Sequence, residues 1–375
     1  MKILLIYSGK SGPMRIAADM AKFLHRKGCD VCLFLLDSSE YKYDFAGIRT
    51  NFPSPFFDRL GYFGKFLRLL KLKGIKFNPD VILTSFGFSI PFIRNFFPQL
   101  PIVYNMMGSP RPEVVTDNFL LKVYYILEKL LSSFYARRVC TFTISEYHRQ
   151  YILNKWKVRI GYIHNGIDTE SFCPAAPEEK LRIKKELEVK NFDTVVTLGL
   201  TRFTPMYKPF YIKWYIEALR RHPEKKILSI ILGKTTQDQS QKLKRYISEN
   251  AATNHKFELV YLKSPPKNHP LKYYQISDFF ISFLPQSLME KEALACGLPV
   301  ITEFWEGETA KKSLQDSQHH LSKAEFIKKV DLFLSDNCKL NKYSKLSRLV
   351  AERDFASEVM GERYLHAFKE CKEST

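Results

Sequence analysis

The sequence predicts an α/β protein built from two domains, each with a parallel sheet covered by helices on both faces. Short apolar runs alternate with stretches of helical spacing, and this alternation stops once near the middle of the chain and then restarts. Such alternation is typical of parallel strands that are buried on both faces. The chain of 375 residues is long enough for two ordinary domains, each with its own core.

The first domain is predicted from the first residues onward. KILLIY (2–7) has the pattern of a strand, SGKSGP (8–13) that of a loop, and residues 14–27 have helical spacing and end at Gly28. The chain therefore begins as a strand–loop–helix unit. The further strands of this domain are expected at 30–36, 80–86, 101–106, 139–144 and 159–164.

Residues 165–177, NGIDTESFCPAAP, separate the two halves, because they hold an Asn-Gly turn and prolines and show no periodicity. A last helix is expected at 351–371. Two α/β halves should face each other across a cleft, and ligands of open parallel sheets bind beyond the carboxyl ends of the strands. The strands of the second domain are expected at 194–200, 226–233, 257–263, 278–284 and 299–302.

The charge balance indicates an anionic partner. The chain has 58 Lys and Arg residues against 39 Asp and Glu residues, a net charge of +19. Nucleic acid, a phospholipid surface and phosphorylated small molecules would all suit such a surface. Nucleic acid is the least favoured of the three, because the sequence shows no zinc-finger, RNP-like or helix-turn-helix signature.

The cysteines and the hydropathy favour a cytoplasmic protein without a structural metal. The seven cysteines show no metal-ligand spacing, and the C-x-x-C of Cys29 and Cys32 has no second pair. The apolar start is too short for a signal peptide, and no apolar run approaches the roughly 18 residues that a transmembrane helix needs. We therefore expect a reducing, cytoplasmic setting.

The stretch MEKEALACGLPVI (289–301) predicts a short helix with a firm end. Gly297 lies where a left-handed cap would be, and a proline follows two residues later. Glu290 and Glu292 point about 200° apart on a helix and so cannot form a carboxylate pair. Without further information, both are equally well explained as acids that the helix dipole favours in a first turn.

Two loops follow the first strands of the two halves. TLGLTRFTPMYKP (197–209) places Arg202 and Lys208 after a strand, where they could hold a diphosphate; the alternative is a solvated basic loop. SGKSGP (8–13) matches no phosphate-binding motif. Gly12 could still allow a ligand to approach the start of a helix, and the alternative is a plain tight turn.

Residues 56–73, FFDRLGYFGKFLRLLKLK, predict an amphipathic helix that is basic and rich in aromatic residues. Such a helix can lie in an anionic membrane interface, or it can pack its apolar side on its own sheet. Lys65 and Arg68 lie opposite the apolar arc, with Lys71 and Lys73 at its flanks. The apolar arc consists of Phe56, Leu60, Phe63, Phe66, Leu67 and Leu70.

Taken in order, these segments resemble glycosyltransferase family 4, whose members have the GT-B fold. HNGIDTESFCP (164–174) is similar to the family's segment at the domain boundary, and GLTRFTPMYKP (199–209) to its Arg…Lys loop. EALACGLPVI (292–301) resembles the stretch E-A-x-A-C-G-x-P-V-I. SEYHRQYI (145–152) and FASEVMGERYLHAF (355–368) are also similar, so the resemblance spans nearly the whole chain.

The resemblance implies two Rossmann-like domains and a C-terminal helix that crosses back to the first domain. It implies an acceptor-binding domain at 1–166, a linker and connecting helix at 167–190, a domain for the nucleotide sugar at 191–350, and the crossover helix at 351–375. Members of the family retain the configuration of the sugar, use nucleotide sugars as donors and need no metal.

The resemblance also implies roles for residues. Arg202 and Lys208 would hold the donor's diphosphate and stabilise its growing charge during catalysis, and Glu292 would bind the ribose. The helix start near Leu288 would offer N–H groups to a phosphate, as Gly12 could in the first half. Glu290 would be a solvent-facing acid or one that supports the site from behind.

Two positions depart from the family pattern. The family usually has a second glutamate eight residues before the one that matches Glu292, and this chain has Leu284 there. It often has a histidine where this chain has Met107. These departures keep open a second hypothesis, a GT-B-like protein that binds a nucleotide sugar or glycan, or scaffolds a partner, without turnover.

The first hypothesis is a retaining hexosyl-type transferase that moves a sugar from a nucleoside-diphosphate sugar to a glycan or lipid-linked acceptor in the synthesis of a cell-envelope polysaccharide or glycolipid. It would work in the cytoplasm. Residues 56–76 could hold it on the anionic cytoplasmic face of the membrane.

Overall fold

The computed structural model of the chain consists of two compact units. The first is formed by residues 1–166 together with 357–375, and the second by residues 167–356. The structure describes residues 1–8, 12–37, 47–51, 59, 61–106, 119–144, 146–189, 191–200, 210–233, 237–251, 255–261, 270–282, 287–302 and 322–373.

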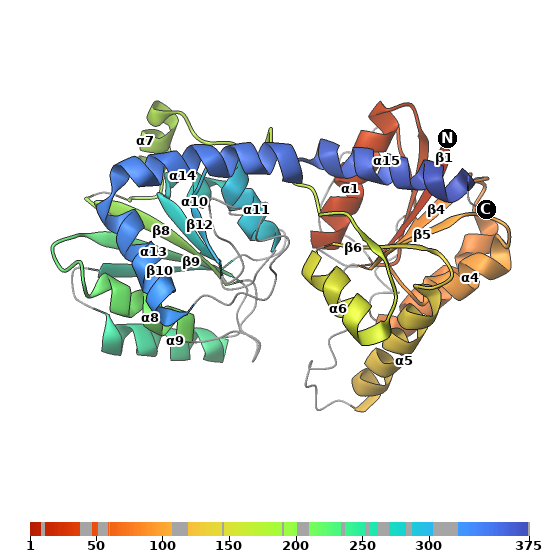
Figure 1. The fold of residues 1–375 in the computed structure, drawn as a ribbon, viewed down its shortest axis with the longest axis horizontal. Coiled ribbons are helices and arrows are strands. Elements are labelled where there is room, and N and C mark those ends of the chain that lie inside the picture. Colours follow the sequence, from red (N-terminus) through yellow and green to blue (C-terminus); the bar gives the residue numbers. More distant parts are fainter. Residues whose placement is uncertain are drawn as a thin grey trace. The chain divides into compact units, whose positions relative to one another are not determined.

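The first unit contains a seven-stranded sheet in the order β3-β2-β1-β4-β5-β6-β7 (Figure 1). All of its paired strands run parallel, so the carboxyl ends of its strands lie along one edge. The order reverses between β1 and β4, which is where ligands commonly bind in such sheets. Its strands are β1 (Lys2–Tyr7), β2 (Asp30–Leu35), β3 (Arg49–Asn51), β4 (Val81–Thr84), β5 (Ile102–Met106), β6 (Cys140–Thr143) and β7 (Gly161–Tyr162).

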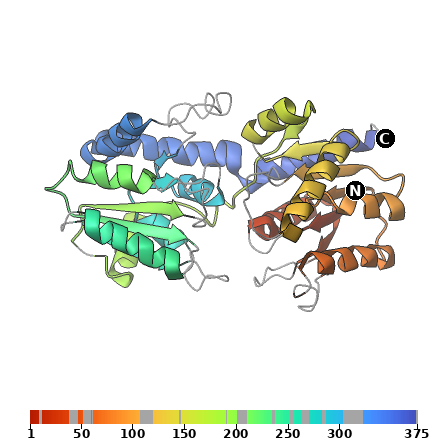
Figure 2. The ribbon, with the colours of Figure 1, turned by 90° about the horizontal axis from the view of Figure 1, so that it is seen from below.

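Helices cover both faces of this sheet. Leu4 and Ile6 of β1 face a buried cluster that α3 to α6 complete, and α1 and α15 pack against the opposite face. Figure 2 shows the unit turned by 90° about the horizontal axis. The helices are α1 (Gly12–Arg26), α3 (Gly61–Leu70), α4 (Ser89–Phe96), α5 (Phe119–Tyr135), α6 (Glu146–Trp156) and α15 (Ser357–Glu373), with a 3-10 turn η1 (Lys71–Gly74).

The second unit holds a five-stranded parallel sheet in the order β10-β9-β8-β11-β12. Buried side chains form one cluster on each face of this sheet. Its strands are β8 (Thr194–Leu200), β9 (Ile227–Gly233), β10 (His255–Tyr261), β11 (Phe279–Ser282) and β12 (Val300–Ile301). Its helices are α7 (Pro177–Glu186), α8 (Phe210–Leu219), α9 (Gln237–Asn250), α10 (Leu271–Ile276), α11 (Leu288–Ala295), α13 (Lys323–Ser335) and α14 (Asn337–Val350).

The C-terminal helix returns to the first unit, as the sequence predicts. A π-helical turn η2 (Ala351–Phe355) follows α14, and α15 then packs against α1 and β5. The helix begins at Ser357 rather than at residue 351, because the extended Ala356 ends the π-turn first. Phe368 and Tyr364 of α15 are buried, which agrees with their predicted inward spacing.

The predicted fold class is confirmed: both sheets are parallel and helices alternate with strands. The strand predicted at 194–200 has those bounds in β8, whereas β10 begins and ends two residues before the predicted 257–263. β3 was not predicted, because it has three residues, none of them apolar. The division into units places 167–190 within the second unit.

The amphipathic helix predicted at 56–73 is described from residue 61 onward, apart from Arg59, and it is turned differently from the expectation. Phe63 and Leu70 of the apolar arc are 63% and 54% exposed. Arg68, predicted on the outer side, is buried against the ring of Phe34 and donates hydrogen bonds to the carbonyls of Leu35 and Asn51. An arginine that finds acceptors and an aromatic face can be buried at little cost, and this explains the turned orientation.

The contact between α1 and α15 depends on a glycine. A Cβ atom on Gly361 would lie 2.2 Å from Cδ1 of Phe23, so the two helices approach more closely than any side chain would allow. Gly74, in η1 of the same unit, has no atom within 4 Å of such a Cβ and serves as a matched control.

We predict that Gly361→Ala lowers the free energy of unfolding by roughly 1–3 kcal/mol, since the added methyl group forces α15 away from Phe23. Gly74→Ala should change it by less than about 0.5 kcal/mol. Urea denaturation of both variants checks the prediction. Equal stabilities of the two variants would contradict the close approach.

Candidate functional site

The carboxyl edge of the second sheet is the candidate site. β8 and β11 are neighbours, and Gly199 pairs with Ser282 at their carboxyl ends. The loop that carries Arg202 and Lys208 therefore starts next to the segment that leads from β11 into α11. These two loops have adjacent origins because parallel strands all end at the same edge.

Several predicted residues fall on segments whose placement is not described. Arg202 and Lys208 lie outside the described residues, as do Leu284 and Met107. Their proposed roles remain predictions. The described part of the site consists of the strand ends and of helix α11.

Helix α11 begins and ends at defined caps. Ser287 is the N-cap, and its hydroxyl accepts a hydrogen bond from the backbone N–H of Glu290 at 3.2 Å. Leu288 is the first helical residue, so the start of the helix lies where the sequence predicts it. Gly297 follows the C-terminus with φ +73°, which confirms the predicted left-handed cap.

Three consecutive charged residues of α11 are buried. Glu290 is 1% exposed, Lys291 4% and Glu292 4%. Of the two alternatives for Glu290, burial excludes the solvent-facing one, and support of the site from behind stays a prediction. Burial of adjacent charges is costly unless they are paired, and it is common where a protein binds a ligand or catalyses a reaction.

The carboxylate of Glu292 is held by a neighbouring helix. Tyr274 of α10 donates its hydroxyl hydrogen to Oε2 of Glu292 at 2.8 Å, and both residues are buried. A hydrogen bond to a buried carboxylate fixes its direction. Tyr274 is thus a positioning residue that the sequence reasoning missed.

Lys291 is the second residue that the reasoning missed. Its ammonium lies 5.3 Å from the centre of the Phe355 ring in η2. Burial lowers its pKa from 10.5 to about 8, and the neighbouring Glu290 carboxylate opposes that shift. The sequence E-K-E could have indicated a buried charge, because at least one of three consecutive positions on a packed helix faces inward.

A second polar cluster lies at the carboxyl edge of the first sheet, beside the point where the strand order reverses. Lys65 of α3 donates to the hydroxyl of Ser8 at 2.7 Å, and that hydroxyl donates to Oδ2 of Asp37 at 3.0 Å. Lys65 and Asp37 are themselves 3.1 Å apart, and the N–H of Ser8 donates to Oγ of Ser85. Ser8, Asp37 and Ser85 follow β1, β2 and β4, and Lys65 reaches them from α3.

Gly12 is the first residue of α1, which follows β1 at this same edge. The predicted position of Gly12 at a helix start is therefore observed. The remainder of the SGKSGP loop, at 9–11, lies outside the described residues.

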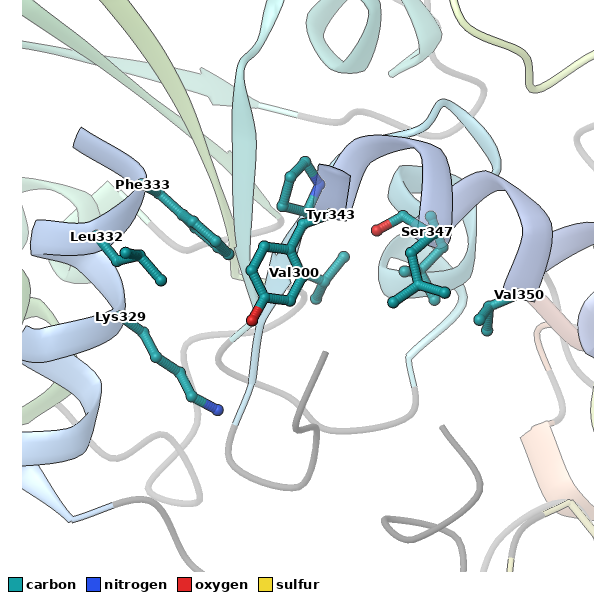
Figure 3. A pocket seen from close by; sticks show the side chains of 10 residues that line it. Val300, Lys329, Leu332, Phe333, Tyr343, Ser347 and Val350 are labelled. Carbon is teal, nitrogen blue, oxygen red and sulfur yellow. The ribbon is translucent and has the colours of Figure 1, made fainter. Parts of the chain in front are cut away.

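A small pocket of the second unit lies elsewhere. Figure 3 shows Lys329, Leu332 and Phe333 of α13 across from Tyr343 and Ser347 of α14, with Val300 between them. The pocket is also lined by Leu294 and Pro299, which belong to the end of α11 and the turn after it. It therefore lies toward the edge where strands begin, away from the candidate site.

Two other kinds of site are absent from the described part of the chain. No group of three His, Cys, Asp or Glu side chains is placed to hold a metal ion there. Within the same residues, every helix is too short or too polar to cross a bilayer.

Comparison with known proteins agrees with this architecture. Residues 11–171 match the family model described as Glycosyltransferase Family 4. This match covers less than half of the chain and shows its similarity to that family there, and the fold of the chain is that of the GT-B glycosyltransferases described next. No curated protein sequence matches the chain.

Solved structures with the same fold cover the chain from end to end. Sucrose-phosphate synthase from Thermosynechococcus elongatus is 14% identical with a TM-score of 0.73, and each chain covers 100% of the other. Anabaena Alr3699/HepE, solved with UDP and glucose, is 18% identical with a TM-score of 0.68 over 99% of this chain and 100% of that one. WaaG, a glycosyltransferase involved in lipopolysaccharide biosynthesis, is 14% identical with a TM-score of 0.64 over 97% and 98%.

We predict that the buried charge of Lys291 makes stability depend on pH. Its pKa of about 8 in the folded protein lies below the ordinary 10.5, so between these values the unfolded chain binds more protons. The free energy of unfolding should rise with pH through this window, because the cost of the buried ammonium is complete below about pH 8 and is relieved above it.

Lys291→Met should remove this cost. The variant should be more stable than the wild type near pH 7 by up to about 3 kcal/mol, and the two should converge as the pH approaches the ordinary pKa of lysine. Urea denaturation of both proteins across the window measures the difference. A difference that stays constant with pH would show that the ammonium of Lys291 is not destabilised by burial.

Proposed function

We propose that the chain transfers a sugar from a nucleoside-diphosphate sugar to a glycan or lipid-linked acceptor, with retention of the sugar's configuration. The observation that carries this proposal is the buried Glu292, held by Tyr274, on a helix that follows the strand next to β8. An acid fixed in this way suits the hydroxyls of a ribose, and the segment that follows β8 in the sequence supplies two cations for the diphosphate.

Arg202 and Lys208 are proposed to hold the diphosphate. Arginine can bind two phosphate oxygens at once, and lysine adds a compact charge. The backbone N–H groups at the start of α11, near Leu288, offer further donors to a phosphate. Glu292 would then accept hydrogen bonds from the ribose hydroxyls, and the buried Glu290 would support the site from behind.

The proposed reaction breaks the bond between the anomeric carbon and the leaving phosphate oxygen. The negative charge that grows on this oxygen is stabilised by Arg202 and Lys208, which can supply several kcal/mol when they are positioned beforehand. The acceptor hydroxyl forms its bond to the anomeric carbon on the same face, and its proton passes to the leaving phosphate. The two cations are proposed to do this without a metal.

The acceptor is proposed to bind to the first unit. Ser8, Asp37, Lys65 and Ser85 offer donors and acceptors beside the start of α1 at Gly12, where ligands of parallel sheets commonly bind. Sugar hydroxyls are the groups that such a mixed cluster can recognise, because each can both donate and accept.

The structural relatives support the donor and the setting. The Anabaena protein was solved with UDP and glucose, and WaaG takes part in lipopolysaccharide biosynthesis. We therefore propose a uridine nucleotide sugar as the first donor to test, and a role in cell-envelope polysaccharide or glycolipid synthesis at the cytoplasmic face of the membrane.

A second candidate function is binding or scaffolding without turnover. Leu284 and Met107 favour it, since they replace the glutamate and the histidine that the family often has at these positions. Both candidate functions include binding of a donor, but only the transferase converts the donor, even if slowly.

We predict that Arg202→Ala with Lys208→Ala weakens nucleotide-sugar binding about a hundredfold, because two charge-assisted contacts to the diphosphate are lost. A variant with Lys185→Ala and Lys256→Ala loses the same charge from exposed positions of the second unit and should bind like the wild type. Titration calorimetry with a panel of nucleotide sugars measures this.

The same panel, followed by NMR of the anomeric proton, tests turnover and stereochemistry. Release or transfer of the sugar with its original configuration supports the proposed reaction. Inversion would refute retention, and binding without turnover in the presence of acceptor extracts would select the second candidate. Equal affinities of the wild type and the first variant would refute the proposed diphosphate site.

A further inference from the structure

Two cysteines of the first unit meet where helix α15 packs on the sheet. Cys140 is the first residue of β6, and Cys371 lies in the last turn of α15. Their thiols are hydrogen-bonded to each other. All seven cysteines of the chain are free, so the two form a dithiol that a disulfide bond could replace.

Strand β6 presents Cys140 to the helix. Phe142, two residues later in the same strand, contacts the ring of Tyr364 in α15, and the two ring centres are 6.5 Å apart. Successive side chains of a strand alternate between the two faces of its sheet. Cys140 therefore lies on the same face as Phe142, which is the face that α15 covers.

Helix α15 presents Cys371 to the strand. Tyr364, Phe368 and Cys371 are spaced by four and three residues, which aligns them along one side of a helix, and all three are buried. Sγ of Cys371 lies 3.7 Å from the carbonyl oxygen of Ile102, the first residue of β5. The pairing of β5 with β6 brings Ile102 next to Cys140, and Figure 1 shows α15 beside β5.

The surroundings make Cys371 the more acidic of the two thiols. The hydrogen bond from the thiol of Cys140 lowers the pKa of Cys371 below its ordinary 9.0, burial opposes this shift, and the charge of Arg94 adds to it. The same hydrogen bond, together with burial, raises the pKa of Cys140. Because the thiolate is the reactive form of a cysteine, Cys371 is the nucleophile of the pair and Cys140 its proton-bearing partner.

The C-x-x-C motif of the first unit does not offer such a pair. Burial raises the pKa of Cys29, and it raises that of Cys32 to about 11. Cys32 lies within β2, which starts one residue after Cys29. Extended chain separates the Cα atoms of residues three apart by about 10 Å, which exceeds the roughly 7 Å that a disulfide can span.

The pair is open to small reagents and closed to large ones. Cys140 is half-buried, and Cys371 is 8% exposed. The neighbouring Arg137 and Arg138 are exposed, so Cys140 lies close to the surface. A small neutral oxidant such as hydrogen peroxide can therefore reach the sulfur atoms more readily than a bulky disulfide can.

We propose that Cys140 and Cys371 are a reversible oxidation site, at which hydrogen peroxide forms a disulfide that ties the end of α15 to β6. The thiolate of Cys371 attacks one peroxide oxygen, which gives a sulfenic acid and releases hydroxide. The sulfur of Cys140 then bonds to that of Cys371, and the sulfenic hydroxyl leaves with the Cys140 proton as water. The two sulfur atoms lose two electrons, the peroxide gains them, and a dithiol reductant reverses the change.

The disulfide would secure a helix end that is otherwise held by noncovalent contacts. Beyond Phe368, the last turn of α15 is linked to the sheet by the exposed ion pair of Lys372 with Asp80, at 3.5 Å. Exposed ion pairs contribute little to stability, and helix ends open locally more often than the core does. A covalent bond at Cys371 prevents this opening.

The oxidation site is independent of the proposed sugar transfer. Cys140 and Ile102 begin their strands, so the pair lies at the amino edge of the first sheet, whereas the polar cluster of that sheet lies at its carboxyl edge. Oxidation can be measured without donor or acceptor. Either proposal can therefore fail alone.

The test is thiol titration and peptide mapping by mass spectrometry of the full-length protein, before and after treatment with hydrogen peroxide. The free thiols should fall from seven to five per chain, and the digest should contain the peptide of Cys140 linked to that of Cys371. Dithiothreitol should restore all of them. Cys338→Ser removes an exposed thiol of the second unit and should form the same link.

Single variants test the two roles. Cys140→Ser should accumulate a sulfenic acid at Cys371 that dimedone traps, whereas Cys371→Ser should be trapped at Cys140 about tenfold more slowly. In the wild type, oxidation should slow hydrogen–deuterium exchange of the last turn of α15 about tenfold, and it should leave this exchange unchanged in both variants. A full set of free thiols after peroxide, a link between other cysteines or between chains, equal trapping in the two variants, or unchanged exchange in the oxidised wild type would overturn the proposal.

Discussion

The parallel pairing of every strand pair in the two sheets is the constraint on which the rest of the structure depends. Parallel strands cannot be joined by short turns, so helices must cross back over both faces and bury them. All carboxyl ends then share one edge of each sheet. Ligands of such sheets commonly bind at this edge, because the loops that lead from the strands into the helices begin there.

The carboxyl edges of the two sheets carry different polar side chains. The first has a network of hydroxyls with one ion pair, formed by Ser8, Asp37 and Lys65. The second has consecutive charges on α11, of which Glu292 is held by Tyr274. Mixed hydroxyl groups suit sugar hydroxyls, whereas an acid with a fixed direction suits the hydroxyls of a ribose.

Helix α11 carries a buried charge at a cost in stability. A buried ammonium whose pKa falls to about 8 lowers the stability of the fold at neutral pH. Small residues at Ala293 and Ala295 and the caps at Ser287 and Gly297 hold the helix in place despite this charge. Proteins accept such costs where a site must be ready before its ligand arrives.

Much of the fold could be predicted from the sequence because buried parallel strands leave a strong pattern. β8 combines apolar and β-branched residues, and its bounds were predicted without error. β3 has no such pattern. It is a strand because it pairs with β2, and this pairing cannot be read from the local sequence. The Gly297 cap was predictable, since a glycine and a proline after a helix leave few alternatives.

The orientation of helices was harder to predict. The sequence of α3 shows two faces but not which of them packs against the sheet. Arg68 is buried because the ring of Phe34 and the carbonyls of Leu35 and Asn51 contact its guanidinium. Helix α5 (Phe119–Tyr135) holds few charged residues, so its sequence does not show which of its sides faces the sheet. The side of α5 that is exposed, which includes Ile126 and Leu130, is determined by the tertiary contacts of Ser132 and Tyr135 on its other side.

We propose that a nucleotide sugar binds at the carboxyl edge of the second sheet. Hydrogen–deuterium exchange, with and without the nucleotide that calorimetry shows to bind, tests it most directly. We predict slower exchange in the segment after β8 (201–209) and in the first turn of α11, from Leu288 to Lys291. Protection confined to the first unit, or to the pocket between α13 and α14, would contradict it.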